Sequence, residues 1–588
     1  MRSRHSIDTP RAQMTGAEIV LQALRDNGVK HIFGYPGAAV LPIYDELFQQ
    51  EDIRHILVRH EQGAGHAAEG YARSTGKVGV MLVTSGPGVT NAITPLQDAL
   101  MDSVPLVCLS GQVPTTLIGS DAFQECDTVG MTRACTKHNR LVNDVNELAA
   151  VIHEAFRIAG SGRPGPVLVD MPKDVLFASG SYSLREAVAP RPSYQPDNSC
   201  GIREIEAAIA LMTAARRPVI CVGGGVVNSG PEAANRLREL VDLTGFPVTS
   251  TLMGLGAYPA SGPNWLKMAG LHGSDEANMA MQDCDLMLCI GARFDGGLAV
   301  GVDGFSPHSR KIQIDIDAAS LNKTVRADIG IQGDAGGVLA EFLRLWRALP
   351  RAPDRARLAD WWSMIAGWRA RRSFSYAVRE DVIMPQYAIE RLYELTKDRD
   401  TYITTEVGQH QIWAAQYYGF EQPNRWMTSG GLGTMGYGLP AALGVQIANP
   451  GSLVIDMAGD ASVQMTMKEM SAAVQHNAPI KIFILNSGDQ GTVRQHGNPD
   501  FVKLAEAYGG HGIRCERPAE LDDAILEMIE VNMPVLFDCR VAELADRLPM
   551  IGPGRARNEM LLSGEVGAAL FAASADGEGR VESASHQT

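Results

Sequence analysis

Short apolar runs rich in β-branched residues alternate with amphipathic runs along most of this chain. Residues 453–457 and 480–485 are almost wholly apolar, which is typical of strands buried on both faces of a sheet. Residues 465–475, which lie between them, carry apolar side chains at helical spacing. The stretch 453–486 therefore predicts a right-handed strand–helix–strand unit.

The same alternation fills three blocks, 14–184, 201–349 and 381–541, and predicts an α/β fold of three doubly wound domains with parallel sheets. A helix is expected at 16–26, and the other expected strands are 31–34, 53–58, 78–84, 106–110, 167–170, 219–222, 247–251, 286–290 and 311–316. The similar size of the blocks suggests a repeat at the scale of domains.

The segments between and after the blocks differ in composition. Residues 190–198 are polar with three prolines and suit a linker, and 351–380 reads as a second connector with helical parts. Residues 562–588 are small and polar, so we expect a disordered tail.

Composition narrows the class of protein. The 588 residues are 45% hydrophobic and 20% charged, as in a large α/β enzyme. A net charge of −15 argues against nucleic-acid and anionic-membrane partners, and no apolar run is long enough to span a bilayer. The polar start lacks a secretory signal, and nine scattered cysteines without a Cys-x-x-Cys pair suit a reducing compartment. We therefore expect a cytoplasmic protein with neither a disulfide framework nor a zinc site.

Oxygen-bearing side chains follow the two strands of the 453–486 unit. Asp460 follows the first strand, while Asn486 and Ser487 follow the second. Because parallel strands end at one edge of a sheet, this trio suits a hard cation such as Mg²⁺. An Asp that caps a helix beside a turn glycine, here Gly459, is the commoner meaning of such a sequence when it is taken alone.

Other candidate residues also follow predicted strands. Glu61 suits a general acid or base in a cleft, although a helix-start carboxylate is the simpler interpretation. Glycines at 86 and 88 and at 223–225 would let the backbone approach an anion, or they would only allow tight packing. Together with Arg293, Asp295 and Asp315, the second glycine run favours a bound nucleotide. Five glycines in 430–438 indicate backbone close to a ligand, with Met435 facing it or filling the core.

Taken together, these segments resemble the large catalytic subunit of acetohydroxyacid synthase (acetolactate synthase), a family of thiamine-diphosphate carboligases. The resemblance runs from residue 14 to about residue 562. The most specific segments are 33–37 (Phe-Gly-Tyr-Pro-Gly), 60–64 (His-Glu-Gln-Gly-Ala), 84–88 (Thr-Ser-Gly-Pro-Gly), 121–125 (Asp-Ala-Phe-Gln-Glu), 136–139 (Thr-Lys-His-Asn), 291–295 (Gly-Ala-Arg-Phe-Asp) and 426–436.

The resemblance implies a pyrimidine-binding first domain, a central FAD-binding domain and a diphosphate-binding third domain, with active sites between two chains. Glu61 would activate the aminopyrimidine of thiamine diphosphate, the Gly433 carbonyl would accept from its amino group, and Met435 would hold its bent shape. Asp460 would bind Mg²⁺. The remaining implied contacts are Val407, Gly408, Gln409, His410, Ala461 and Ser462 for the cofactor, and Gln112, Phe123 and Lys137 for the catalytic site.

By the same resemblance, FAD has a structural role and contacts Arg163, Leu271, His272, Gly273, Arg293, Asp295, Asp315 and Asp334. The implied reaction is decarboxylation of pyruvate and addition of the resulting hydroxyethyl carbanion to a second 2-oxo acid, in branched-chain amino-acid biosynthesis. The implied assembly is a homodimer or a dimer of dimers, with a small regulatory subunit as a further partner.

Three departures concern the metal and the acceptor. Ala461 replaces a glycine, and Ser487 stands where the family has a metal-binding Asn, with the Asp489 carbonyl beside it. His496 replaces a Trp of the second-substrate pocket, and the segment that folds over the cofactor in the family is missing after it, so that Pro499 is expected at the first turn of the next helix.

The third departure is Gly296 and Gly297, which replace an Asp-Arg pair whose Arg binds the acceptor carboxylate. Loss of such a charge-assisted contact costs about 1.5–3 kcal/mol.

These departures leave three interpretations open. The first is an acetohydroxyacid synthase with altered acceptor preference. The second is another thiamine-diphosphate enzyme, either a 2-oxo acid decarboxylase or a carboligase with an aldehyde acceptor. The third is a catalytically weak homologue that acts as a partner subunit; the missing segment favours it, whereas Glu61, Gln112, Lys137 and Met435 speak against it.

Overall fold

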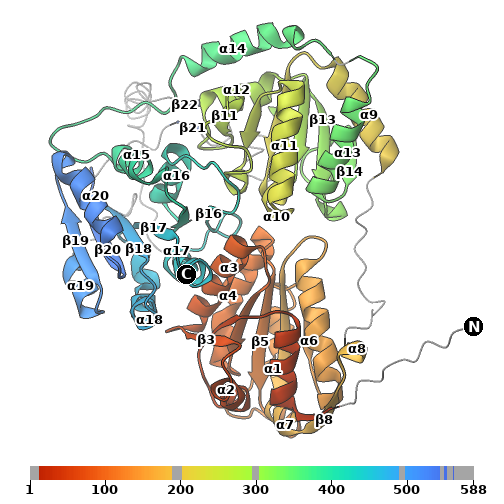
Figure 1. The fold of residues 1–588 in the computed structure, drawn as a ribbon, viewed down its shortest axis with the longest axis vertical. Helices are drawn as coiled ribbons and strands as arrows, with labels where there is room; N and C mark the ends of the chain where they lie inside the picture. The colour runs from red at the N-terminus through yellow and green to blue at the C-terminus, as the bar shows by residue number, and fades with distance from the viewer. Residues whose placement is uncertain are drawn as a thin grey trace, which may run out of the picture.

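The computed structural model describes residues 12–187, 201–294, 304–351, 353–488, 497–542, 549–551 and 560–561. It contains three six-stranded parallel sheets covered by helices, one inside each of the three predicted blocks, which confirms the predicted fold class (Figure 1). In Figure 1 the first domain lies at the bottom, the central domain above it, and the third domain to the left. The predicted linker 190–198 and the predicted tail 562–588 lie outside the described residues.

In the first domain the sheet is buried on both faces. Two successive residues of one strand, Ile32 and Phe33, belong to two different cores, because successive side chains point to opposite faces. The strand order is β3 (Arg54–Leu57), β2 (His31–Gly34), β4 (Gly79–Val83), β5 (Leu106–Gln112), β7 (Pro166–Pro172), β6 (His138–Leu141).

The helices of the first domain divide between the two faces. One face carries α1 (Gly16–Asp26), α2 (Leu41–Phe48), α6 (Val145–Gly160) and α7 (Lys173–Phe177), and the other carries α3 (Glu61–Thr75) and α4 (Pro87–Asp102). A short antiparallel pair, β1 (Ala12–Thr15) with β8 (Ser179–Tyr182), closes the domain.

The central sheet has the order β11 (Trp265–Met268), β10 (Val248–Ser250), β9 (Pro218–Val222), β12 (Leu286–Ile290), β13 (Arg310–Asp315), β14 (Ile329–Gln332). Its helices are α9 (Ile202–Ala214), α11 (Pro231–Thr244) and α13 (Ala335–Arg347) on one face, and α12 (Asp275–Asp283) and α14 (Ala359–Arg369) on the other. Helix α14 belongs to the predicted connector, but Trp361 is buried and donates to the Pro218 carbonyl, so this part is packed against the domain.

The third sheet has the order β16 (Trp426–Met427), β15 (Thr401–Thr405), β17 (Leu453–Gly459), β18 (Lys481–Asn486), β20 (Val535–Arg540), β19 (His511–Cys515). Its helices are α15 (Pro385–Thr396), α16 (Gln409–Tyr417), α17 (Gly438–Ala448), α18 (Met470–Gln475), α19 (Phe501–Ala507) and α20 (Leu521–Glu530).

Two local predictions in the third domain are wrong. The helix expected at 465–475 is two short 3₁₀ turns followed by α18, because Thr466 leaves helical geometry and its hydroxyl donates to the Gly436 carbonyl. Pro499 precedes the first turn of α19, since Asp500 is the residue that caps the helix through its side chain.

The strand orders show which domains are related. We number the strands of each six-stranded sheet by their order along the chain. The first and third sheets then have the same spatial order, namely second, first, third, fourth, sixth, fifth strand. The central sheet has the order of doubly wound dinucleotide-binding folds. The repeat suggested by the sequence therefore holds for two of the three domains.

Helices α3 and α17 join the first and third domains within one chain. A side chain at Gly444 would overlap the Ala67 carbonyl oxygen, and one at Gly70 would overlap the Ala441 carbonyl. One continuous core runs through both helices. The small residues of these helices therefore allow two domains to share a core.

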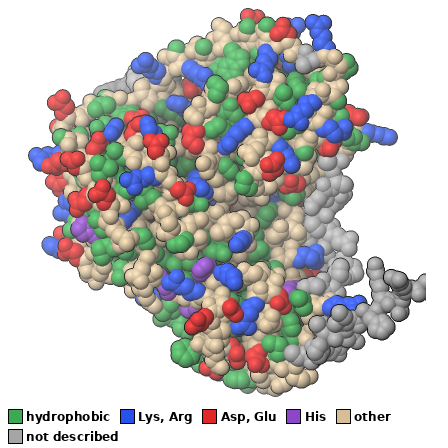
Figure 2. All heavy atoms as spheres, viewed as in Figure 1, with side chains coloured by type: hydrophobic (Ala, Val, Ile, Leu, Met, Phe, Trp, Pro, Cys, Tyr) green, Lys and Arg blue, Asp and Glu red, His purple; other side chains and the backbone are tan. Residues whose placement is uncertain are grey.

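The surface carries charges of both signs. On the face drawn in Figure 2, acidic and basic side chains are interspersed over the central and third domains. Among the described residues, no helix combines the length and the apolar character that crossing a bilayer requires.

Candidate active site

The predicted cation site is assembled at the carboxyl edge of the third sheet. Asp460 Oδ2 accepts hydrogen bonds from Gly488 N (3.0 Å) and from Asn498 Nδ2 (2.7 Å). The same two donors lie 3.2 and 3.1 Å from Asn486 Oδ1. Burial raises the pKa of the Asp460 carboxyl above its ordinary value. The structure therefore brings Asp460 and Asn486 together as predicted and adds Asn498, for which no sequence pattern indicated a role.

Asp538 determines which way the Asn486 amide points. Its Oδ1 accepts from Asn486 Nδ2 at 2.7 Å, and Arg514 Nε donates to its Oδ2 at 2.9 Å. Because a carboxylate only accepts, Asn486 must present its nitrogen to Asp538 and its oxygen to Asp460. Asp538 and Arg514 thus position the cation site, and no spacing in the sequence indicated them.

His410 fills the space beside the turn after β17. A side chain at Gly459 would lie 2.7 Å from His410 Nδ1, and Gly459 does not have a positive φ. Glycine is therefore needed to make room for the ring, not to allow the tight turn that the sequence suggested. Burial lowers the pKa of His410 to about 4, so the imidazole is neutral, and its Nε2 has no hydrogen-bond partner among the described residues.

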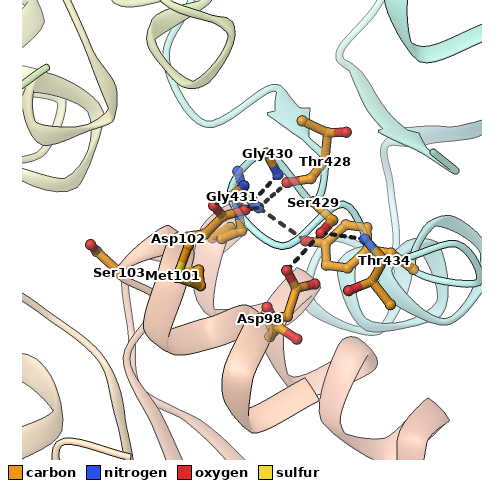
Figure 3. Close-up of polar contacts among 12 residues, drawn as sticks. Asp98, Met101, Asp102, Ser103, Thr428, Ser429, Gly430, Gly431 and Thr434 are labelled. Carbon is orange, nitrogen blue, oxygen red and sulfur yellow. Dashed lines mark hydrogen bonds and ion pairs between the residues drawn. The ribbon is translucent and has the colours of Figure 1, made fainter. Parts of the chain in front are cut away.

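Two carboxylates of α4 hold the glycine-rich segment 429–436 (Figure 3). Asp98 Oδ1 accepts from Ser429 Oγ at 2.7 Å, and Asp102 accepts from Gly430 N and Gly431 N at 2.8 and 2.7 Å. Ser429 Oγ in turn accepts from the backbone N–H groups of Gly433 and Thr434. The first domain therefore fixes the conformation of a segment of the third domain.

The glycines of this segment have more than one cause. A side chain at Gly430 would overlap Met253, whereas Gly433 and Gly436 have φ of +76° and +93°. Only Gly433 faces open space, beside Met435, whose side chain is 39% exposed. Close approach to a ligand, which the sequence suggested for the whole run, therefore stays a prediction for Gly433 and for Gly430 and Gly431, which line a cavity beside the central domain.

The buried carboxylate of Glu406 also holds the glycine-rich segment 429–436. Glu406 is fully buried and accepts from Gly436 N and Leu439 N at 2.5 and 3.2 Å. Burial raises its pKa to about 7. No local pattern in the sequence indicated this role, because it depends on Gly436 and the start of α17 lying against the end of β15.

The four predicted catalytic residues of the first domain occupy two places. Glu61 begins α3, and its Oε2 accepts from Asn91 Nδ2 at 2.9 Å. Gln112 ends β5, and its Nε2 donates to Asp170 and to the Cys126 carbonyl. Phe123, three residues before Cys126, is 90% exposed. Lys137 precedes β6 at the opposite edge of the sheet and donates to the carbonyls of Ile158 and Ser161. Among the described residues, Glu61 makes no hydrogen bond to the third domain.

Two adjoining cavities, of about 560 and 380 Å³, lie where the central domain meets its neighbours. Arg163 and Arg293 line both. Leu271 and His272 line the larger cavity, and Asp315 and Asp334 line the smaller one. Gly273 follows directly, and its N–H donates to the Gly270 carbonyl. The structure therefore gathers most of the predicted FAD contacts around one space.

The glycine run after β9 serves packing and the cavity together. A side chain at Gly225 would lie 2.6 Å from Gly291 Cα, so glycine is needed for contact between two strand ends. Gly224 and Gly225 also line the smaller cavity. Tight packing is therefore confirmed for this run, and approach of its backbone to an anion stays a prediction.

Some predicted residues lie outside the described part of the chain. These are Asp295 of the FAD set, Asp489 of the metal set, and Gly296, Gly297 and His496 of the acceptor pocket.

Comparisons with known proteins agree with this geometry. Family models match residues 14–131 (thiamine pyrophosphate enzyme, N-terminal TPP binding domain), 205–342 (central domain) and 406–539 (C-terminal TPP binding domain). The chain is 46% identical over 570 residues to acetolactate synthase isozyme 3 large subunit of Escherichia coli, covering 94% of this chain and 99% of that protein.

Two further relatives extend this similarity. The acetolactate synthase large subunit of Haemophilus influenzae is 44% identical over 94% of this chain and 98% of its own length. The mitochondrial acetolactate synthase catalytic subunit of Saccharomyces cerevisiae is 41% identical over 95% of this chain and 85% of its own length. The chain belongs to the acetolactate synthase large-subunit family.

The residues present fit the cofactors of this family, which are thiamine diphosphate, Mg²⁺ and FAD. Asp460 and Asn486 offer converging oxygens, the donor type that Mg²⁺ prefers. The unpartnered Nε2 of buried His410 and the open space at Gly433 leave room for polar contacts with a ligand. Two arginines and the acidic residues around the central cavities suit the phosphates and hydroxyls of a dinucleotide.

Proposed function

We propose that this protein is an acetolactate synthase-type carboligase, which decarboxylates pyruvate and joins the two-carbon unit to a second 2-oxo acid. The observation that carries the proposal is similarity over 94% of the chain to a protein named as such a large subunit, with Glu61, Gly433, Met435 and Asp460 all present. The product serves branched-chain amino-acid biosynthesis.

Each residue then has a defined part. Bound thiamine diphosphate supplies the electron sink for decarboxylation. Glu61 exchanges a proton with the aminopyrimidine, and Asn91 orients its carboxylate. The Gly433 carbonyl and Met435 would contact the cofactor and hold its shape. Asp460 would hold Mg²⁺, with Ser487 and Asp489 as further ligands, and Val407, Gly408, Gln409, His410, Ala461 and Ser462 would contact the cofactor.

The active site is completed by a second copy of the chain. Within one chain Glu61 is bonded to Asn91 of its own domain, and the cation site lies in another domain. A homodimer, or a dimer of dimers, would bring Glu61, Gln112 and Phe123 of one chain to the third domain of its partner. Lys137 would reach the site from the opposite edge of the first sheet.

FAD would occupy the two central cavities as a structural cofactor, held by Arg163, Leu271, His272, Gly273, Arg293, Asp295, Asp315 and Asp334. Because relatives are named large subunits, a small regulatory subunit is a further proposed partner. The cysteines that the structure describes are free, which supports a cytoplasmic location.

A second candidate is a decarboxylase or an aldehyde carboligase of the same cofactor class. It is favoured by Gly296, Gly297 and His496, which remove a carboxylate-binding Arg and a Trp from the acceptor pocket. An aldehyde has no carboxylate for that Arg to bind.

Product identification separates the candidates. Purified protein with thiamine diphosphate, Mg²⁺ and FAD is given pyruvate alone, pyruvate with 2-oxobutyrate, and pyruvate with an aldehyde. Acetolactate or acetohydroxybutyrate supports the proposal, whereas acetaldehyde or an acyloin supports the second candidate. Pyruvate that is not consumed contradicts both and favours the weak homologue that acts as a partner subunit.

A further inference from the structure

Asn498 lies at the centre of the cation site, at a position where the sequence suggested no ligand. Its Nδ2 is within 2.7 Å of Asp460 Oδ2 and 3.1 Å of Asn486 Oδ1, and therefore stands between the two oxygens that face the cation site. Its own Oδ1 is buried and has no hydrogen-bond partner among the described residues. Asn498 Oδ1 is therefore an oxygen that no donor of the described residues uses.

A half-turn of the Asn498 amide about its Cβ–Cγ bond exchanges Nδ2 and Oδ1 and moves no other atom of the site. After this turn the Asn498 oxygen takes the place of Nδ2, next to the side-chain oxygens of Asp460 and Asn486. Mg²⁺ takes oxygen ligands and usually keeps only one or two carboxylates together with substrate phosphates. The turned site offers one carboxylate and two amide oxygens.

One arginine holds both amides in place. Arg514 Nε donates to Asp538, which orients Asn486, and Arg514 Nη2 donates to Asp500 Oδ1 at 2.8 Å. Asp500 caps α19 two residues after Asn498, with Pro499 between them. The chain two residues after Asn498 is therefore anchored by the same arginine that orients Asn486 through Asp538.

We propose that Asn498 ligates the divalent cation of this protein through Oδ1, in place of the Asn that the family has at the position of Ser487. The inference rests on the proposed function only in the choice of cation. Without the cation, the Asn498 NH₂ group bridges Asp460 and Asn486. With the cation, the amide turns and its oxygen faces the metal.

Direct Mn²⁺ binding tests this role without turnover. Chelator-treated protein is mixed with Mn²⁺ and saturating thiamine diphosphate, and free Mn²⁺ is measured by electron paramagnetic resonance. Asn498→Ala should weaken Mn²⁺ binding at least about tenfold, as loss of a metal-site contact does. Asn498→Asp keeps the shape and adds a charged oxygen, so it should bind Mn²⁺ more tightly than Asn498→Ala and at least as tightly as the wild type.

Asn532→Ala, at an exposed Asn of the same domain, is the matched control and should bind Mn²⁺ as the wild type does. Unchanged or tighter Mn²⁺ binding by Asn498→Ala would overturn the inference, because the NH₂ group would then only compete with the cation. Far-ultraviolet circular dichroism checks that each variant is folded.

The product assay is scored separately. Weakened Mn²⁺ binding by Asn498→Ala in a protein that makes no acetolactate upholds the metal ligand and rejects the proposed function. Normal Mn²⁺ binding by Asn498→Ala in a protein that makes acetolactate rejects the metal ligand and upholds the proposed function.

Discussion

Asp170, at the end of β7, shows how burial sets the protonation of a single residue. Its two oxygens accept from Ser110 Oγ at 2.7 Å and from Gln112 Nε2 at 3.0 Å, and burial raises its pKa to about 7. Because the pKa is higher in the folded state than in the unfolded state, the group stabilises the fold at low pH. This contribution is lost as the pH rises through about 7.

Asp170→Asn should remove this pH dependence, because the amide has no proton to gain. The difference in melting temperature, wild type minus variant, should decrease between pH 5 and pH 8. The corresponding difference in the free energy of unfolding should decrease by about 3 kcal/mol. Differential scanning fluorimetry at several pH values measures it. A difference in melting temperature that stays constant with pH would contradict the role of Asp170.

At the scale of elements, the glycine-rich segment depends on α4. Ser429 has one proton, which it gives to Asp98, and so both lone pairs remain for Gly433 N and Thr434 N. Ser429→Ala removes all three contacts. We expect faster hydrogen exchange of the 429–436 amides in the cofactor-free protein and roughly tenfold weaker thiamine-diphosphate binding.

Ser452→Ala is the control for this prediction, since Ser452 Oγ donates to Asp400 at 2.5 Å on the exposed surface of the same domain. Its exchange at 429–436 should match that of the wild type. If Ser429→Ala gives the same protection as the control, Asp98 does not hold the segment.

The contact between α3 and α17 is the second prediction at this scale. Gly444→Ala places a methyl group on the Ala67 carbonyl, so the helices must separate and the shared core must open. We expect a loss of about 1–3 kcal/mol, seen as a lower melting temperature.

Gly367→Ala, in α14, is the matched control for Gly444→Ala. A side chain there meets open space, so the substitution should be neutral or stabilise the protein by about 0.4–1 kcal/mol. If both variants melted at the same temperature, the close approach of α3 and α17 would have no energetic weight.

At the scale of the whole molecule, the proposed site needs two chains. Glu61→Gln and Asp460→Ala should each abolish acetolactate formation. When the two are refolded together, about half of the dimers combine one chain of each kind, and each of these has one intact site and one site with both changes. Activity should therefore return to about a quarter of the wild-type value. Continued inactivity of the mixture would show that each site is formed within one chain.

The sequence alone determined the α/β class, most strands of the first and central sheets, the two strands around Asp460, and the residues at the ends of strands, including Glu61, Asp460 and Arg293. It could do so because apolar periodicity and strand-end chemistry are local properties of the chain. The one expected helix that failed, 465–475, is bent by contacts of Thr466 and Glu469 with distant segments.

Only the tertiary structure decided which residues support the site. Asn498, Asp538, Glu406 and Asp98 act through partners that are 12 to more than 300 residues away in sequence, and no spacing encodes such contacts. The role of Gly459 was also decided there, because the space that it leaves is filled by His410 from another element. Burial of polar groups, and with it their protonation and orientation, is a property of the packed molecule, since it depends on every segment that excludes water from them.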